Sequence, residues 1–450
     1  RCLGLCVEGG ATSLVLPQNW LFLTSYRKFR ERLLTQDRWH LIARLGPQAF
    51  QTPMWDFNVQ LLCLSRGNPQ PPSHPQAAQS PSLLPPPEAA APRADAGMIR
   101  GLDVSACRTA ADKAAKLLST EIKSVEQAAQ LGNPDARVAL GEEADLPLLK
   151  TFADGLVGLQ TSDDPMFVAA YWEVDSRDGG IWELMQSTPD IFSNYAGQSW
   201  MVRWEKGEGL LLSLPTAYAT KGLKAVGKPG IAIHRMGQLF SYRYGEERFH
   251  QNVATIIPGD ESHLPAIWCF CSSPDYNTAV REIDQSLKVT NATLVKVPFD
   301  LDHWTQVAAE RYPNGLPKPY TDDPTQWIFH GHPCGSVIWD EDAKWTAQGP
   351  LRTDDSVLQV AVARLLGYRW PAELDPDMEL AGEQRAWVQR CEALLPHADD
   401  DGILCIPPVR GEAAAADRLL NLLADAYGEA WSTDTLAALL RSADHAGRPL

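Results

Sequence analysis

One short stretch of the sequence combines basic and aromatic side chains in a way that suits contact with nucleic acid. Residues 221–250 hold six basic and two acidic residues, so six minus two leaves +4 in a chain whose formal net charge is −16. Basic side chains bind phosphates regardless of sequence, and the interleaved Tyr242, Tyr244 and Phe249 offer stacking or groove contacts. The alternative is a solvated loop whose charges only aid solubility. The candidate DNA-binding residues are Lys221, Lys224, Lys228, Arg235, Arg243, Tyr244 and Arg248, of which Arg235 or Arg243 could read guanine through a bidentate pair.

A second group, His330-Gly331-His332-Pro333-Cys334, suggests metal binding at first sight. A metal site needs further well-placed ligands, and the sequence offers only His303 and the acidic residues 340–342 as guesses. Residues 342–344 read Asp-Ala-Lys, half of a nuclease metal site, but no Pro-Asp precedes them at suitable spacing. We therefore predict no metal site and interpret the motif as a structural or solvent-facing turn.

The first 66 residues read as strand, helix, strand, loop and strand. An apolar run at 14–16 stops at Pro17, and apolar residues then recur at helical spacing around position 29. Two more runs, at 40–45 and 57–64, are typical of buried strands. The order predicts the closing half of an open α/β sheet, in which ligands bind outside the carboxyl ends of the strands.

Three runs in this region carry a family resemblance: LVLPQNWLFLTSYRKFRERLL, WHLIARLGPQAF and NVQLLCLSR. They resemble the last third of the catalytic domain of adenine-specific (N6) DNA methyltransferases, above all the single-chain type IIG and BREX-like enzymes of restriction and phage-defence systems. The resemblance implies a Rossmann-like class I methyltransferase sheet, S-adenosyl-L-methionine as cofactor and an extruded adenine as target. The family's Gly-rich cofactor loop and Asn-Pro-Pro-Tyr tetrapeptide lie upstream of the strand at 14–16, and neither is in this sequence. The chain is therefore expected to be a C-terminal portion that is inactive alone.

The same resemblance assigns roles to residues near the strand ends. An aromatic residue in the loop after the second strand stacks on the extruded adenine in that family, and Phe50 falls at this position, although a Phe beside a strand is ordinarily core. Pro17 and Asn19 follow the first strand, where Asn19 could contact the base or cofactor. The residues at 17–20, Pro-Gln-Asn-Trp, are explained nearly as well if a polar residue next to Asn19 caps the N-terminus of a helix.

The remaining chain divides by composition into four parts. Residues 67–100 are a Pro-rich linker, residues 101–155 a helical connector with one amphipathic helix over 108–131, residues 156–300 a mixed α+β DNA target-recognition domain, and residues 301–450 a mostly helical region. Within the recognition domain the family-like motifs are Gly158 to Thr161, with Ser162 where Gly is usual, Trp204 to Gly209, and Phe249 to Pro258. Expected strands lie at 167–174, 199–204, 230–234, 239–243, 252–257 and 288–297, and expected helices at 263–272, 276–287, 357–366, 383–395, 414–427 and 433–440.

Composition sets the wider frame. With 450 residues and 44% hydrophobic content the chain can bury two to four cores, and its nine cysteines show no paired spacing, as expected of reduced thiols. We find no signal peptide or apolar span, which predicts a cytoplasmic protein without a membrane partner. The expected partners are double-stranded DNA and an N-terminal methyltransferase segment or other defence-system subunits. A non-catalytic DNA-specificity subunit and a scaffold without a DNA role are the alternatives.

Overall fold

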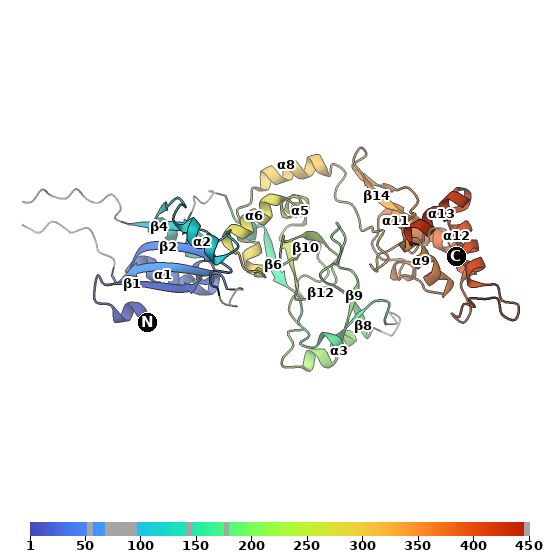
Figure 1. The fold of residues 1–450 in the computed structure, drawn as a ribbon, viewed down its shortest axis with the longest axis horizontal. Helices are drawn as coiled ribbons and strands as arrows, with labels where there is room; N and C mark the ends of the chain where they lie inside the picture. Colours follow the sequence, from blue (N-terminus) through green and yellow to red (C-terminus); the bar gives the residue numbers. More distant parts are fainter. Residues whose placement is uncertain (52–56, 68–96, 141–145, 175–179, 445–450) are drawn as a thin grey trace, which may run out of the picture. The chain divides into compact units, whose positions relative to one another are not determined.

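The computed structural model describes residues 1–51, 57–67, 97–140, 146–174 and 180–444. The protein is a mixed α/β structure with several sheets and helices (Figure 1). It forms two compact units, the first built from Arg1–Leu149 and Asp275–Phe299 and the second from Lys150–Pro274 and Asp300–Leu450. Among the described residues, no helix is both long enough and apolar enough to cross a membrane.

The first unit is organised around one five-stranded sheet, in the order β1-β3-β2-β4-β5. Strand β3 is antiparallel to both of its neighbours, so β1 and β2 run in the same direction, and β4 is parallel to β2. Leu14 and Ile42 both pair with Leu62, which confirms that the three predicted strands are neighbours. The strands are β1 (Ala11–Pro17), β2 (Arg38–Gly46), β3 (Val59–Ser65), β4 (Met98–Asp103) and β5 (Lys123–Glu126).

Helix α1 (Arg27–Gln36) connects β1 to β2 and packs Leu33 and Leu34 into the core of the first unit. Arg30 is fully buried, unlike the other basic residues of this helix, which are exposed. Its guanidinium donates hydrogen bonds to four backbone carbonyls, which offsets the cost of burying the charge. These carbonyls belong to Trp20, Leu23, Asp135 and Ala136.

Two expectations for this unit are wrong. The helix predicted over 108–131 is present only as α2 (Ala110–Leu117), and residues 123–126 form β5, which pairs with β4. The strand predicted over 288–297 contains the short helix α7 (Asn291–Leu294). Its apolar residues are buried in the first unit, so burial, not strand pairing, accounts for their composition.

The second unit contains two four-stranded sheets. One has the order β11-β10-β13-β6 and is antiparallel throughout, and the other has the order β12-β8-β9-β7. The predicted strands near 199–204, 230–234, 239–243 and 252–257 are confirmed, whereas 167–174 yields only a short strand after a helical turn. The elements are β6 (Ala153–Val157), α3 (Asp164–Phe167), β7 (Val168–Ala170), β8 (Trp182–Gln186), β9 (Trp200–Arg203), α4 (Leu210–Ser213), β10 (Gly230–His234), β11 (Ser241–Tyr244), β12 (Arg248–Phe249), β13 (Val253–Pro258) and α5 (Leu264–Cys271).

The rest of the second unit is mainly helical, and the helices predicted near 357–366, 383–395, 414–427 and 433–440 are confirmed. A hairpin of two strands was not expected. Helix α6 (Pro274–Ile283) belongs to the first unit from its second residue, Asp275, onward. The later elements of the second unit are α8 (Leu301–Arg311), β14 (Val337–Asp340), β15 (Trp345–Gln348), α9 (Ser356–Leu365), α10 (Pro371–Leu374), α11 (Gly382–Arg390), α12 (Ala415–Tyr427) and α13 (Thr433–Ser442).

The domain boundaries drawn from composition stay predictions. Most of the Pro-rich linker expected at 67–100 lies outside the described residues, although its last residues belong to β4. The recognition domain expected over 156–300 contributes to both units, because residues 275–299 return to the first one.

Candidate nucleic-acid interface

Residues 218–228, here called the lysine loop, present three of the predicted DNA-binding residues. Lys221, Lys224 and Lys228 are exposed, whereas Ala225 between them is fully buried. Gly222 fixes the loop against the sheet: its φ is +79°, and a Cβ there would meet the ring of Phe249 at 2.8 Å. The loop therefore holds its cations outward from a packed base.

Tyr218 is a candidate contact that sequence reasoning missed. Its ring is 53% exposed, and Lys221 Nζ lies 4.0 Å from the ring centroid. An exposed aromatic ring beside a cation can stack on a base while the ammonium contacts a phosphate. The sequence did contain a signal for this contact, because Tyr218 lies only three residues before Lys221, the first lysine of the basic stretch.

The three aromatic residues expected to interleave with the basic ones are core residues instead. Tyr242, Tyr244 and Phe249 are 0%, 3% and 1% exposed, and all three pack in one cluster of the β10–β13 sheet. Tyr242 and Tyr244 lie on the same face of β11 because side chains two apart in a strand share a face. Tyr244 therefore presents little surface for a DNA contact, which stays a prediction.

Two predicted arginines are engaged within the protein. Arg248 lies 3.5 Å from the ring centroid of Trp204, and its Nε donates to Glu183 Oε2 at 2.7 Å. Arg235 Nη1 donates to the carbonyl of Gln251 at 3.0 Å. Their contact with DNA stays a prediction, but a paired and stacked cation contributes less to phosphate binding than a free one.

Arg243 lies in a different environment from the lysines. It is half-buried, and its guanidinium carbon is 6.0 Å from the ring centroids of both Tyr195 and Trp268. It lines a cavity of about 530 Å³ within the second unit. Its contact with DNA stays a prediction.

Two of the family-like motifs, those that begin at Gly158 and at Phe249, lie against each other. A Cβ at Gly158 would stand 2.1 Å from the carbonyl oxygen of Phe249, so only glycine fits. Leu159 N donates to the same carbonyl at 2.9 Å. Ser162 has φ +66°, a conformation that favours glycine, and its Oγ donates to Thr216 O at 2.6 Å. The serine thus adopts the glycine-like turn and gains a local hydrogen bond there.

The carboxyl edge of the first unit's sheet brings together the other predicted residues. Strands β1, β2 and β4 are parallel, so the residues after Pro17, Gly46 and Asp103 meet at one edge. Pro17 and Asn19 are exposed there, and Phe50 is 41% exposed. Phe50 is thus partly accessible, and its role in base stacking stays a prediction.

Polar groups at this edge mainly bond one another. The Gln18 amide oxygen accepts from Arg44 Nε and Nη2 at 2.9 Å each in the amide orientation that satisfies both, and Arg44 Nη1 lies 3.4 Å from Asp103 Oδ2. Gln18 caps no helix through its side chain, contrary to the capping interpretation. Burial lowers the pKa of Arg44, and Asp103 opposes this effect.

The end of α6 and the segment that follows it close the same edge. Arg44 Nη2 donates to Glu282 O at 2.8 Å, Asn58 Nδ2 to Ser286 Oγ at 3.1 Å, and Gln285 Nε2 to Ser105 Oγ at 2.5 Å. These polar groups are occupied within the protein, and the chain has no Gly-rich loop. Without the Gly-rich loop the described residues could supply only part of a cofactor site, so S-adenosyl-L-methionine stays a prediction for the whole enzyme.

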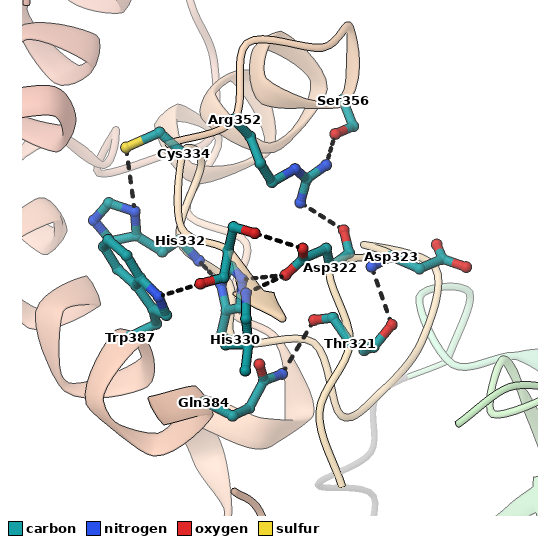
Figure 2. A network of polar contacts seen from close by, with 12 residues as sticks. Thr321, Asp322, Asp323, His330, His332, Cys334, Arg352, Ser356, Gln384 and Trp387 are labelled. Atoms are coloured by element: carbon teal, nitrogen blue, oxygen red, sulfur yellow. Dashed lines mark hydrogen bonds and ion pairs between the residues drawn. The ribbon is translucent and has the colours of Figure 1, made fainter. Parts of the chain in front are cut away.

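The His330 to Cys334 motif forms a buried structural network, not a solvent-facing turn (Figure 2). His332 N donates to His330 Nδ1 at 2.9 Å, and the Asp322 carboxylate accepts from Val337 N at 3.0 Å. Burial lowers the pKa of His332 to about 3 and raises the pKa of Cys334 to about 12. The described residues hold no group of three or more His, Cys, Asp or Glu side chains that could bind a metal.

Comparisons with known proteins give distant structural matches only. No family model matches the sequence, and no curated protein matches it. Similar solved structures include the Type IIL restriction-modification enzyme MmeI in complex with DNA, at 10% identity and TM-score 0.34 over 97% of this chain. The ATP-dependent Type ISP enzyme LlaBIII bound to DNA matches at 10% identity and TM-score 0.34 over 96%, and the DrdV–DNA complex at 11% and 0.33 over 99%. The chain spans 49%, 32% and 51% of those three chains, respectively.

Proposed function

We propose that this chain is the DNA-recognising, C-terminal part of an adenine-N6 DNA methyltransferase of a restriction-modification or phage-defence system. The observation that carries the proposal is the arrangement of the three runs that resemble the family. They form β1, β2 and β3, which are contiguous in one sheet, and α1 connects the two parallel strands. The close contact between Gly158 and Phe249 adds support from the proposed recognition domain.

The chain's own residues would divide the work between its two units. The lysine loop would contact phosphates, and Tyr218 would stack on or beside a base. Phe50 would support the extruded adenine at the carboxyl edge of the sheet. In the whole enzyme the cofactor would supply the methyl group, and the residues that bind it would come from a segment outside this chain.

A DNA-binding titration at several salt concentrations tests the recognition role. Substitution of Lys221, Lys224 and Lys228 by Ala is expected to weaken binding to duplex DNA at least about tenfold at low salt. It should also reduce the salt dependence by about three phosphate contacts. The matched control removes three exposed cations elsewhere in the second unit, as Lys150→Ala, Arg410→Ala and Arg441→Ala. Equal affinity of both variants would favour a scaffold without a DNA role.

A methylation assay tests the catalytic part of the proposal. The chain incubated with S-adenosyl-L-methionine and DNA is expected to transfer no methyl group, because it lacks the cofactor loop and the Asn-Pro-Pro-Tyr tetrapeptide. Addition of an N-terminal methyltransferase segment should restore transfer. If a separate modification chain encoded by a neighbouring gene restores it, the protein is a specificity subunit. Robust transfer by the chain alone would contradict the proposal.

A further inference from the structure

The lysine loop exposes apolar side chains as well as its three cations. Leu223 and Val226 are 40% and 37% exposed, and each of them lies between two lysines in the sequence. A single exposed apolar residue is common on protein surfaces, but here two occur in one short basic segment. Phosphate binding by the lysines uses neither of these side chains, so it does not explain their exposure.

Consecutive turns set the direction of these side chains. Ala225 N donates to Gly222 O at 2.9 Å, and Val226 N donates to Leu223 O at 3.3 Å. Residues three apart lie on the same side of such a turn. Gly222 and Ala225 form the inner side, because a Cβ at Gly222 would meet the ring of Phe249 and Ala225 is fully buried. Leu223 and Val226 therefore share a second side, which is exposed.

The remaining side of the loop carries positive charge. Lys221 and Lys224 are also three apart, so they lie together beside the apolar side. Residues 218–228 contain no acidic residue, and Glu246 is an acidic neighbour whose carbonyl accepts from Gly227 N at 2.9 Å. Three lysines minus this glutamate leave +2 in a chain whose net charge is −16. The loop is therefore complementary to an anionic partner.

Duplex DNA offers such a loop both a charged and an apolar partner. The phosphates of the two strands flank a minor groove only about 6 Å wide, so lysines on one side of a short loop can bind them while an adjacent apolar side chain reaches the bases. Proteins that enter this groove often insert apolar side chains, Leu among them, between base steps. Insertion unstacks the step and bends the duplex.

We propose that Leu223 is a wedge that enters the minor groove and opens one base step of duplex DNA. Val226 would pack beside it, and Lys221 and Lys224 would bind the flanking phosphates. Because bending costs less at deformable steps such as TA than in a stiff A-tract, the wedge selects sequences without a hydrogen bond to any base. The inference rests on the DNA function proposed above and adds a sequence preference that phosphate contacts cannot supply.

Titration of two duplexes tests this preference. Both have about 30 base pairs and the same ends, and the centre is alternating TA in one and an A-tract in the other. The full chain is expected to bind the TA duplex at least about fivefold more tightly. Leu223→Ala should bind both duplexes equally and keep the salt dependence, because the lysines remain. Leu223→Met should keep the preference, since Met also enters base steps.

Two control variants separate the wedge from the phosphate contacts. Leu374→Ala removes a leucine of similar exposure, 39%, and should keep the preference for the TA duplex. The triple lysine-loop variant should lose affinity for both duplexes by the same factor. A full preference in Leu223→Ala would refute the assignment of the wedge to this residue.

Fluorescence of 2-aminopurine in the central TA step reports the insertion directly. Unstacking raises its emission, so the full chain should increase the emission at least about twofold. The double variant Leu223→Ala/Val226→Ala should leave the emission at the level of free DNA. Energy transfer between dyes at the two duplex ends should rise in the same complexes in which the emission rises, because the duplex bends there.

The outcomes distinguish the wedge from the DNA function on which it rests. Salt-dependent binding with equal affinity for the two duplexes and no rise in emission would overturn the wedge alone. Absence of binding to either duplex would overturn both proposals. Vesicles that contain anionic lipid provide the other surface that a basic and apolar loop can enter. Vesicle binding that is lost in Leu223→Ala, together with unchanged DNA binding, would assign the loop to a membrane surface and overturn the wedge.

Discussion

The Glu247 carboxyl keeps its proton to higher pH in the folded protein than in the unfolded chain. Its pKa is raised from 4.5 to about 8, chiefly by burial and further by Glu246. Between these two values the folded state binds more protons than the unfolded state, so stability falls as pH rises from about 4.5 to 8 and is level above that.

Glu247→Gln should remove most of this pH dependence. We expect the variant to exceed the wild type in stability at pH 8.5 by roughly 2–4 kcal/mol, and to differ little at pH 4.5. Denaturant unfolding at both pH values measures this difference. The exposed Glu208→Gln serves as the control and should follow the wild type. An equal pH dependence in all three proteins would show that the carboxyl is ionised in the folded state.

Gly158 is a residue whose type is fixed by close packing of two backbones. In Gly158→Ala the new methyl group would lie 2.1 Å from Phe249 O and 2.5 Å from His250 O, and both are backbone atoms that cannot rotate away. We expect a loss of about 2–4 kcal/mol in unfolding free energy, since overpacking forces the backbone to shift. Gly382→Ala is the control, because nothing lies within 4 Å of a Cβ there. Equal stability of the two variants would show that the sheet relaxes freely at Gly158.

At the scale of elements, the segment around His330 is held by one carboxylate. Asp322 accepts from Ser336 Oγ at 2.9 Å and Val337 N at 3.0 Å, and its backbone carbonyl accepts from Arg352 Nη1 at 2.5 Å (Figure 2). Asp322→Ala leaves buried donors unpaired, so the second unit should lose about 2–4 kcal/mol of stability.

Thermal unfolding of Asp322→Ala beside the exposed Asp342→Ala checks this expectation. A lower transition temperature only for Asp322→Ala would support the carboxylate as the organising group. A shift of the same size in both proteins would mean that the turn is held by its backbone alone.

Elements with a clear period were predictable, and those that depend on distant partners were not. The helices predicted between residues 357 and 440 have apolar residues at intervals of three and four positions, a pattern that can be read directly from the sequence. Residues 123–126 carry no apolar run, and they form β5 only because β4 offers an edge to pair with. The apolar composition around Val289 and Val297 is typical of a strand, yet the burial of these residues alone explains that composition.

The candidate site shows the same division. Exposed lysines in a Gly-containing turn could be expected from charge and spacing, and the structure agrees on their exposure. The burial of Tyr244 and the convergence of Gln198, Arg243 and Glu247 could not be expected, because they depend on which face of β11 is covered and on a partner far along the chain. The local sequence pattern indicates whether a segment forms a strand or a turn, whereas tertiary packing determines which of its side chains stay exposed.

At the scale of the whole molecule, the first unit depends on a segment that follows much of the second unit in the sequence. Leu149 N donates to Val297 O and Phe299 N to Pro147 O, each at 2.9 Å, and Arg137 Nη1 donates to Lys296 O at 2.7 Å. Seven apolar or aromatic side chains of the returning segment, residues 275–299, are at most 3% exposed: Tyr276, Val280, Val289, Leu294, Val295, Val297 and Phe299.

We therefore expect residues 1–149 alone not to fold cooperatively. Loss of these seven buried side chains removes roughly 10–20 kcal/mol of burial free energy, which is at least comparable to the whole net stability of a domain. Residues 1–149 joined through a flexible linker to 275–299 should regain a cooperative denaturant transition, and a version with 275–299 in scrambled order should not. If residues 1–149 unfold cooperatively by themselves, the returning segment is an accessory that packs on a finished core. If only the native order restores the transition, the recognition region is inserted within the sequence of the first unit.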